Sequence, residues 1–594
     1  MTSDTVSNES TGKFYNAEKH TQILIALLKS HGIRKVIASP GSTNVCLVGS
    51  LQSDPFFEIY SAVDERSAAF MAVGMAAESG EAVALSCTGS TASRNYIPGL
   101  TEAYYRKLPV LAITSSQHLG RVGQYYNQVI DRSSPLADMV MESVTVDCVN
   151  TREDEWACAL NINKALIALT KNGGGPAHIN LVTTYNDDFS CKKLPPVKTI
   201  QYSDGRKTLP SLSSFKHIAI LVGVHRRWTE ELAEAVEEFC EAYNAVVIAN
   251  HASNYKGKYG YNPNLINNMV QYSPKVEKAD LVIYIGSISR YPSKMNEREM
   301  WRVNPDGEIR DMEKKLTRVF AMEEVDFFRS YTNKNIKKKN TGYAKQWQSE
   351  YQTVLNKIPE LPYSNVWVAK NMSQMLPEGS VFHLSGSNTA RSWNFFQIPL
   401  GVECYSNDGT MGIDGQISSL VGESLVDPKR LHFGASGDLT FFYDMGTIGN
   451  RHIKSNLRLM IVNNGLGVEF KNHSCNSSKF GEAADRYMAA AGHFGNKSPD
   501  LIRHYAEDLG YEYLSASTKE EFLEKAVRFT TPELTERPMI FEVFTESEKD
   551  AEAIYIMNHY VSNIQGGAKE HAKKIIKSVL SERTIATVSH LIKK

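Results

Sequence analysis

Short apolar runs alternate with longer segments of helical periodicity along almost the whole chain, and this alternation constrains the fold more than any other feature. The apolar runs are bounded by Gly or Pro, as strands in α/β proteins commonly are. The alternation is typical of parallel α/β units, in which a helix connects each strand to the next. We predict strands at Lys35–Ser39, Ala82–Cys87, Pro109–Thr114, His178–Val182, Ile218–Val222, Ala245–Ala249, Leu281–Ile285, Arg318–Met322, Val381–Leu384, Arg430–Phe433, Leu457–Val462 and Met539–Phe544.

The predicted strands fall into three clusters separated by polar stretches. Residues 191–214 contain Leu-Pro-Pro-Val-Lys and read as a linker, and a second linker is predicted at 337–345. We therefore predict an α/β protein with three doubly wound parallel-sheet domains and a helical C-terminal tail. The predicted ranges are 14–190, 215–340 and 346–549 for the domains and 550–594 for the tail. We expect the basic tail helix to pack on the body or on a second subunit.

Composition excludes several function classes. The 65 Lys and Arg residues balance 66 Asp and Glu residues, and 42% of the 594 residues are hydrophobic. This balance argues against a disordered chain and against an electrostatically driven nucleic-acid binder. No apolar stretch is long enough to span a membrane, and the polar N-terminus lacks the plan of a signal peptide. We expect a cytoplasmic protein without nucleic-acid or membrane partners, whose eight scattered cysteines are reduced thiols.

The most informative stretch is residues 434–470, in the third predicted domain. A predicted strand there runs into a Gly-Asp pair that opens a helical segment, and the next strand ends on two adjacent asparagines. The carboxyl ends of neighbouring parallel strands are where such sheets bind ligands. Asp438, an Asn side chain and a backbone carbonyl make an oxygen-only set that suits Mg²⁺, and a helix N-terminus favours phosphate. The alternative is an Asp helix cap and an Asn-Gly turn that bind no metal.

This spacing resembles the signature of the thiamine-diphosphate-dependent enzyme family. The resemblance implies that Asp438, Asn464 and the carbonyl of Leu466 hold Mg²⁺, and that Gly437 lies against the cofactor. Leu439 also lies there by the resemblance, although the family usually has a glycine at this position.

The family also requires a glutamate in the other outer domain, and Glu65 matches it. By the resemblance this carboxylate bonds the pyrimidine N1′ and favours the imino tautomer, whose N4′ takes the proton from the thiazolium C2. Taken alone, Glu65 reads as an acidic residue at a helix start. The resemblance further assigns cofactor contacts to Ser42 and Asn95, and the apolar wedge behind the cofactor to Met411, with Ile413 as the second candidate.

Within the family, the chain resembles the 2-succinyl-5-enolpyruvyl-6-hydroxy-3-cyclohexene-1-carboxylate synthases of menaquinone biosynthesis. Matching stretches include residues 39–44, 63–76, 87–103, 405–415 and 437–445. The departures concern arginines that hold substrate carboxylates in those synthases. Thr43, Gln117 and Asp408 stand where the synthases have arginine, whereas Ser42, Gln128, Ser387 and Arg391 are retained.

These departures predict a carboligase of the same mechanism with a different substrate pair. A carboxylate at Asp408 would repel a dicarboxylate, so we expect a small 2-oxo acid such as pyruvate as donor, unless Asp408 pairs with Arg391 or another base. Asp408, Asn388, His118 and Gln117 would suit a hydroxylated or sugar-like acceptor. Gln128, Asn127 and His118 are candidates for proton transfer. Glu469 could lie near the cofactor because it follows the asparagines, but we assign it no role.

Three alternatives remain open at this point. The enzyme can be a simple 2-oxo-acid decarboxylase or a genuine member of the synthases above, and a catalytically silent paralogue is the third reading. No phosphate loop for a flavin is recognisable in the middle domain. The resemblance implies a homodimer or homotetramer with active sites at the subunit interface.

Overall fold

The computed structural model describes residues 13–206, 208–225, 228–288, 296–332, 342–494 and 497–563. The described residues divide into two compact units. The first contains residues 13–206 and 306–321, and the second contains 208–305 and 322–563, each with the gaps just given.

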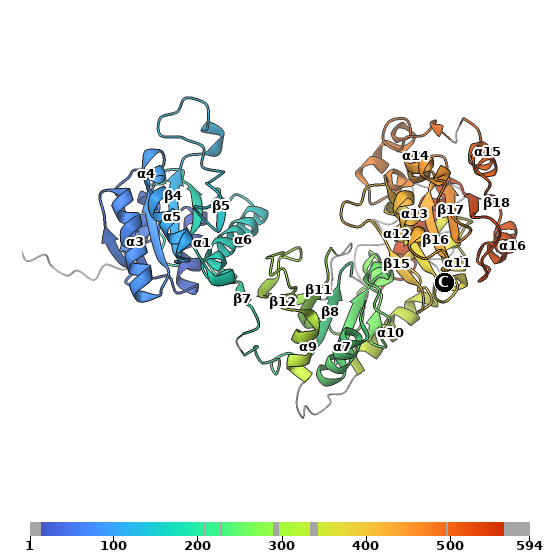
Figure 1. Ribbon diagram of the computed structural model, residues 1–594, viewed down its shortest axis with the longest axis horizontal. Coiled ribbons are helices and arrows are strands. Elements are labelled where there is room, and N and C mark those ends of the chain that lie inside the picture. Colours follow the sequence, from blue (N-terminus) through green and yellow to red (C-terminus); the bar gives the residue numbers. More distant parts are fainter. Residues whose placement is uncertain are drawn as a thin grey trace, which may run out of the picture. The chain divides into compact units, whose positions relative to one another are not determined.

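The first unit is built on a six-stranded parallel sheet with the order β2-β1-β3-β4-β6-β5 (Figure 1). Its strands are β1 (Lys35–Ala38), β2 (Glu58–Ser61), β3 (Val83–Cys87), β4 (Val110–Ser116), β5 (Glu142–Val146) and β6 (Ala177–Val182). The helices of this part are α1 (Lys19–Ser30), α2 (Val45–Gln52), α3 (Glu65–Ser79), α4 (Thr91–Asn95), α5 (Ile97–Tyr105) and α6 (Arg152–Ala168), with 3-10 turns η1 (Leu119–Arg121) and η2 (Lys171–Gly173).

Helices cover both faces of this sheet. One hydrophobic cluster joins α1, α2 and α6 to one face, and a second joins α3 and α5 to the other. Small residues let α3 lie close to its neighbours: Ala68, Ala69, Ala72 and Ala76 are all buried. Gly99 of α5 faces Ala69, where a Cβ would come within 2.5 Å of the Ala69 Cβ. This close packing fixes the start of α3, and therefore the position of Glu65.

The second unit contains a six-stranded parallel sheet of the same plan, with the order β15-β14-β16-β17-β19-β18. Its strands are β14 (Val381–Leu384), β15 (Glu403–Tyr405), β16 (His432–Gly437), β17 (Leu457–Asn463), β18 (Glu512–Ala516) and β19 (Met539–Phe544). The helices of this part are α10 (Gly342–Leu355), α11 (Asn365–Met372), α12 (Ser387–Trp393), α13 (Gln416–Val426), α14 (Asp438–Asp444), α15 (Leu501–Asp508), α16 (Lys519–Phe529) and α17 (Ser547–His559), with 3-10 turns η4 (Ser373–Met375), η5 (Met445–Gly449), η6 (Val468–Lys471) and η7 (Asn476–Ala484).

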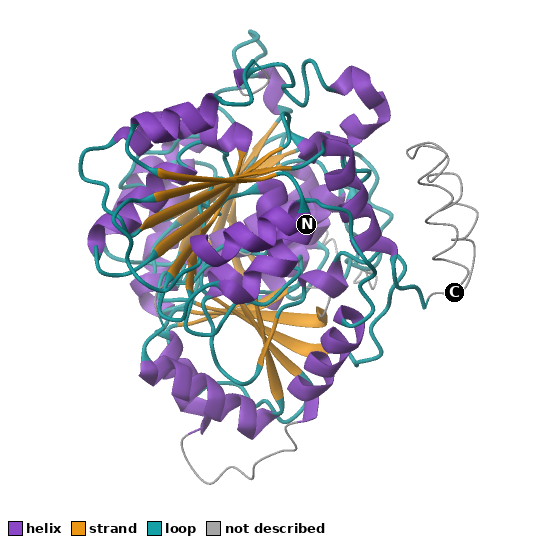
Figure 2. Cartoon of the chain, turned by 90° about the vertical axis from the view of Figure 1, so that its right-hand side faces the viewer, coloured by secondary structure: helices purple, strands orange, loops and turns teal. Residues whose placement is uncertain are grey.

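The remaining strands are also parallel. In the second unit, β10, β9, β8, β11 and β12 pair in that order, and in the first unit β13 pairs with β7. Helices pack against the twisted strands throughout (Figure 2). The elements are β7 (Gln201–Ser203), β8 (Ile218–Val222), β9 (Ala245–Ala249), β10 (Gly260–Tyr261), β11 (Ala279–Ile285), β12 (Asn296–Val303), β13 (Leu316–Phe320), α7 (Glu230–Tyr243), α8 (Asn264–Asn267), α9 (Glu324–Thr332) and η3 (His251–Ser253).

The structure thus confirms an α/β fold with three parallel sheets. Every predicted strand is present, with ends that differ by a few residues at most. The predicted boundary between residues 549 and 550 falls inside α17, so the first part of the predicted tail is a helix that belongs to the second unit. The amphipathic helix predicted further along the tail lies outside the described residues, as do residues 337–341 of the second predicted linker.

Two other predictions concern the state of the cysteines and the presence of membrane-spanning helices. All eight cysteines are free thiols, and five of them are buried. Among the described residues, no helix is long and apolar enough to cross a membrane.

Candidate functional site

Asp438 and Asn464 lie close to each other at the carboxyl ends of two neighbouring strands, in the sheet of the second unit that contains β14 to β19. β16 and β17 are adjacent parallel strands, with Gly437 opposite Val462, and Asp438 begins α14 directly after β16. Asn464 follows the last residue of β17. The backbone N–H of Gly465 donates to Asp438 Oδ2 at 3.0 Å, which joins the two loops. The structure therefore brings together the pair that the sequence pattern singled out.

Asp438 is a buried carboxylate without a cationic partner among the described residues. Its exposed fraction is 4%. Burial raises the pKa of Asp438 to about 7, against the lowering effect of backbone hydrogen bonds from Leu439 and Gly465. A buried carboxylate that lacks a counter-charge is costly, and a bound cation would remove that cost.

Asp550 on α17 is a residue of this site that the sequence reasoning missed. It is fully buried and accepts hydrogen bonds from the Asn365 N–H at 2.7 Å, the Thr545 hydroxyl at 2.8 Å and Asn464 Nδ2 at 2.9 Å. Burial raises its pKa to about 6. Since Asp550 holds the amide nitrogen of Asn464, the amide oxygen is the atom left to face a metal.

The donor set around Asp438 fits Mg²⁺. It consists of one carboxylate, the amide oxygen of Asn464 and the carbonyl of Leu466 two residues further on, all hard oxygen ligands. The two latter oxygens each accept one backbone N–H, from Leu466 at 3.4 Å and from Val468 at 3.1 Å, and keep a second lone pair for a metal. Asp550 contributes to the raised pKa of Asp438, so a second negative charge lies close by. A divalent cation would offset both charges.

The segment after β15 carries the predicted wedge residue in a strained conformation. Met411 has φ 55° and is 48% exposed. Hydrogen bonds hold the segment: Asn407 Nδ2 donates to the carbonyl of Gly415 at 3.3 Å and to Ser419 Oγ at 3.0 Å. Left-handed backbone at a non-glycine residue persists where the surroundings fix it, and such residues cluster at ligand sites. Ile413, the second wedge candidate, is half-buried.

The predicted substrate residues of the second unit follow β14 and β15. Asp408 is buried, and its Oδ1 accepts from the Ser406 hydroxyl at 2.9 Å. Arg391, on α12, forms an ion pair with Glu469, with Nη1 2.6 Å from Oε2 and Nη2 2.9 Å from Oε1. Ser387 and Asn388 open the same helix.

The predicted residues of the first unit also follow carboxyl ends of neighbouring strands. Ser42 and Thr43 follow β1, Glu65 follows β2, and Asn95 ends α4, the helix after β3. The Glu65 carboxylate is half-buried in the first turn of α3, behind the N-cap Asp64, which accepts the Ser67 N–H at 2.7 Å. The negative charge of Glu65 contributes to the raised pKa of Cys87 at the end of β3, although burial is the main cause there.

Thr43 and Gln117, the positions at which the resemblance predicts arginine in the synthases, are held by neighbours. The Thr43 hydroxyl is buried, lies 2.6 Å from Thr88 Oγ1 and donates to the carbonyl of Ser115 at 3.1 Å. Gln117 Nε2 donates to the Tyr185 hydroxyl at 3.0 Å.

The loop after β4 carries the three candidates for proton transfer, and all of them are exposed. His118 Nδ1 accepts the N–H of Gly120 at 3.1 Å, so this ring caps the turn η1. Gln128 has φ 60°, a left-handed conformation at a non-glycine residue, as does Tyr125 of the same loop. Ser42 and Asn95 are exposed as well.

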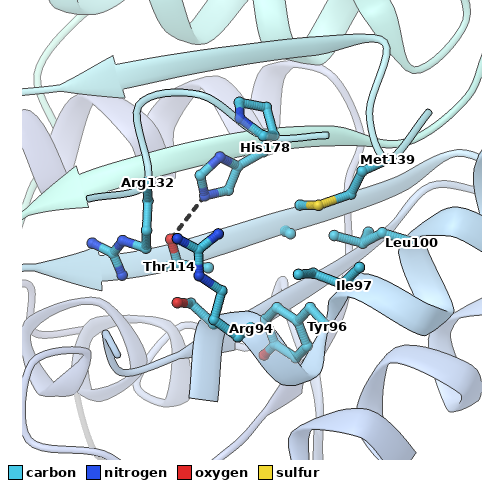
Figure 3. A pocket seen from close by; sticks show the side chains of 11 residues that line it. Arg94, Tyr96, Ile97, Leu100, Thr114, Arg132, Met139 and His178 are labelled. Atoms are coloured by element: carbon cyan, nitrogen blue, oxygen red, sulfur yellow. Dashed lines mark hydrogen bonds between the residues drawn. The ribbon is translucent and has the colours of Figure 1, made fainter. Parts of the chain in front are cut away.

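A separate cavity of the first unit contains none of the predicted residues. Figure 3 shows His178 and Thr114 beside Arg94 and Arg132 at one end of it, and apolar side chains at the other. His178 bonds the hydroxyls of Thr114 at 2.8 Å and Ser143 at 2.9 Å, and burial lowers its pKa to about 3. Its imidazole is thus neutral at physiological pH and serves as a hydrogen-bonding group of the interior.

Comparisons with known proteins agree with the motifs. The family model described as thiamine pyrophosphate enzyme, N-terminal TPP binding domain, matches residues 18–159. A 2-succinyl-5-enolpyruvyl-6-hydroxy-3-cyclohexene-1-carboxylate synthase from Bacteroides fragilis is 30% identical over 574 residues, covering 92% of this chain and 100% of the relative. The enzyme of the same name from Phocaeicola vulgatus is 30% identical over 577 residues, covering 92% and 99%.

A more distant relative of the same name, from Desulfotalea psychrophila, is 27% identical over 557 residues, covering 90% of this chain and 99% of the relative. The similarity therefore extends through both units and is not confined to the N-terminal domain. Because relatives at 30% identity match along nearly their whole length, the protein belongs to the family of thiamine-pyrophosphate-dependent enzymes and is similar to these C–C bond-forming synthases.

Proposed function

We propose that the protein is a thiamine-diphosphate- and Mg²⁺-dependent carboligase that decarboxylates a small 2-oxo acid such as pyruvate and transfers the acyl unit to a hydroxylated or sugar-like acceptor. The observation that carries the cofactor assignment is Asp438, which is buried without a cationic partner among the described residues and accepts the Gly465 N–H next to Asn464. Asn464 in turn donates to Asp550. The donor assignment rests on the buried carboxylate of Asp408 at a position where the related synthases have arginine.

The proposed cofactor contacts come from residues of both units. Asp438, Asn464 and the Leu466 carbonyl would hold Mg²⁺ and through it the diphosphate, with Gly437 and Leu439 alongside. Met411 or Ile413 would support the ring system, and Glu65 would hold the pyrimidine nitrogen. Bound thiamine diphosphate supplies the carbon nucleophile and the electron sink for decarboxylation. Gln128 and His118 lie on an exposed loop and would serve proton transfer there.

The assembly and location follow the resemblance. We infer a homodimer or homotetramer in which the unit carrying Glu65 in one subunit completes the site of the partner subunit. A cytoplasmic location agrees with the biosynthetic relatives.

Two enzymatic alternatives make different products. A simple decarboxylase would release the aldehyde whether or not an acceptor is present. A genuine 2-succinyl-5-enolpyruvyl-6-hydroxy-3-cyclohexene-1-carboxylate synthase would require 2-oxoglutarate and isochorismate. Product analysis by mass spectrometry, with and without aldehyde or keto-sugar acceptors, separates all three.

The donor is tested by CO₂ release from the holoenzyme with pyruvate and with 2-oxoglutarate. We expect kcat/KM for pyruvate to exceed that for 2-oxoglutarate at least about tenfold, because a buried carboxylate disfavours a second negative charge on the substrate. Faster turnover of 2-oxoglutarate, above all with isochorismate as acceptor, would contradict the proposal and favour the synthase.

The pKa of Asp438 predicts how cofactor binding depends on pH. Burial holds this pKa at about 7, so below pH 7 the carboxyl is protonated and Mg²⁺ must displace a proton. We expect the apparent affinity for Mg²⁺ plus thiamine diphosphate, measured by calorimetry, to fall up to about tenfold per pH unit below 7 and to level off above it.

The cofactor's own phosphates also titrate in this range, so Asp438→Asn is the matched comparison. The variant should bind weakly and with a shallower pH dependence than the wild type. Equal slopes for the two proteins would show that Asp438 does not exchange a proton for the metal.

A further inference from the structure

Four hydrogen-bond donors of the second unit converge on the carboxylate of Glu469. Arg391 contributes both arms of its guanidinium, at 2.6 Å and 2.9 Å, Ser387 Oγ lies 3.3 Å from Oε2, and Asn472 Nδ2 lies 3.5 Å from Oε2. We call Ser387, Asn388, Arg391, Glu469 and Asn472 the Glu469 cluster. A paired arginine fork with flanking hydroxyl and amide donors is the arrangement by which proteins recognise carboxylate ligands.

The donors are held in place independently of Glu469. Asn388 Oδ1 accepts from Arg391 Nη1 at 2.8 Å and from Asn472 Nδ2 at 2.7 Å, which orients the fork and the amide together. Ser387 has φ 60°, a conformation that costs a non-glycine residue energy and is typical of functional sites. The cluster therefore has the preorganised character of a binding site.

The cluster also lies at the edge of the sheet where the metal site is. α12, which carries Ser387 and Arg391, follows β14, the neighbour of β16. η6, which carries Glu469, follows the loop of Asn464 and Leu466 after β17. The ion pair is reachable from outside, since the side chains of Arg391 and Glu469 are 22% and 32% exposed.

We propose that Glu469 is an internal carboxylate that fills a carboxylate-recognition subsite of the substrate pocket, and so determines that substrates lack a second carboxylate there. This inference rests on the proposed function. The positive charge of Arg391 and the negative charge of Glu469 cancel, so the filled subsite offers no net charge to an anionic substrate group.

Two polar atoms of the Glu469 cluster are left unsatisfied. Asn388 Nδ2 and Asn472 Oδ1 are buried and have no hydrogen-bond partner within the described residues. Unsatisfied buried polar groups are costly and are often found at functional sites.

The test is to empty the subsite in the cofactor-loaded full-length enzyme with Glu469→Ala. Without the glutamate, Arg391, Ser387 and Asn472 would face a vacated space that accepts a ligand carboxylate. We expect calorimetry to show that glutarate, an unreactive dicarboxylate, binds the variant at least about tenfold more tightly than it binds the wild type. In parallel, kcat/KM for 2-oxoglutarate relative to pyruvate should rise by a similar factor.

Three comparisons make the result specific. Glu469→Gln retains the shape of the side chain and removes its charge. Its affinity for glutarate should therefore rise, but by less than in the alanine variant. This variant serves as the test if Glu469→Ala does not fold. Arg391→Met added to Glu469→Ala should abolish glutarate binding. Glu482→Ala, at an exposed glutamate of η7, should behave as wild type.

The outcomes separate this inference from the proposed function. If the wild type already prefers 2-oxoglutarate, the proposed function is wrong. If the wild type prefers pyruvate but neither folded Glu469 variant gains glutarate binding, or if the gain persists without Arg391, then Glu469 does not fill a carboxylate subsite and the inference is overturned.

Discussion

Asp438→Asn is expected to abolish activity and to weaken the binding of Mg²⁺ with thiamine diphosphate at least about a hundredfold. The asparagine can still accept the Gly465 N–H, now held at 3.0 Å by the aspartate, but it cannot supply the negative charge that a divalent cation requires. We expect turnover with the preferred 2-oxo acid to fall more than about a thousandfold, since the neighbouring carboxylate of Asp550 is already held by Asn365, Thr545 and Asn464. Calorimetry and CO₂ release measure the two effects.

The stability of the cofactor-free variant distinguishes this loss from misfolding. Because burial raises the Asp438 pKa from 3.8 to about 7, the native state loses stability as pH rises through that window. At pH 8 the cofactor-free asparagine variant should therefore be more stable than wild type, by on the order of 1–4 kcal/mol. Lower stability of the variant, or unchanged cofactor affinity, would contradict the metal-site assignment. Asp508→Asn, at an exposed aspartate on α15, is the control.

Glu65→Gln is expected to lower kcat by about 10²–10⁴-fold while cofactor affinity changes little. The side chain is in the first turn of α3, and no hydrogen bond or ion pair within the described residues depends on it, so the amide should leave the helix intact. What the variant loses is a carboxylate able to hold a proton on the cofactor ring. Glu78→Gln, exposed near the other end of α3, should retain wild-type kcat.

Mixing the two inactive proteins tests whether subunits share the site. If Glu65 of one subunit completes the metal site of its partner, subunits of Glu65→Gln and Asp438→Asn exchanged at equal amounts should recover about a quarter of wild-type activity. No recovery, after exchange is confirmed by native mass spectrometry, would show that each chain builds its own site. Full kcat of Glu65→Gln alone would remove Glu65 from the chemistry.

The sequence predicted the strands that are buried on both faces. It missed the strands at sheet margins and also β12, whose sequence Asn-Glu-Arg-Glu-Met-Trp-Arg-Val is mostly polar. β3, β8 and β17 are entirely buried, so each appears as a continuous apolar run. β2 is an edge strand whose residues are mostly exposed, and β18 is a half-buried edge strand, so neither carries a clear apolar signal. A strand at the edge of a sheet is less buried, so it lacks the continuous apolar run by which a strand is recognised in the sequence.

The same limit applies to the site. Asp438 and Asn464 could be predicted because they follow strong strands at a spacing that suits a metal. Asp550 lies 86 residues beyond Asn464 on a helix, and only the fold brings it to the Asn464 amide. Glu469 follows the two asparagines in sequence, but the sequence assigned it no role. Its pairing with Arg391 depends on the packing of α12 against η6, which local sequence does not encode.

The first and last sheets along the chain have the same strand order, and this gives the loops of one unit counterparts in the other. Matched by strand order, β2 corresponds to β15, and β3 corresponds to β16. The loop of Glu65 is then the counterpart of the loop of Asp408, and the loop of Thr88 is the counterpart of the loop of Asp438. One scaffold thus occurs twice in the chain, with different side chains on equivalent loops.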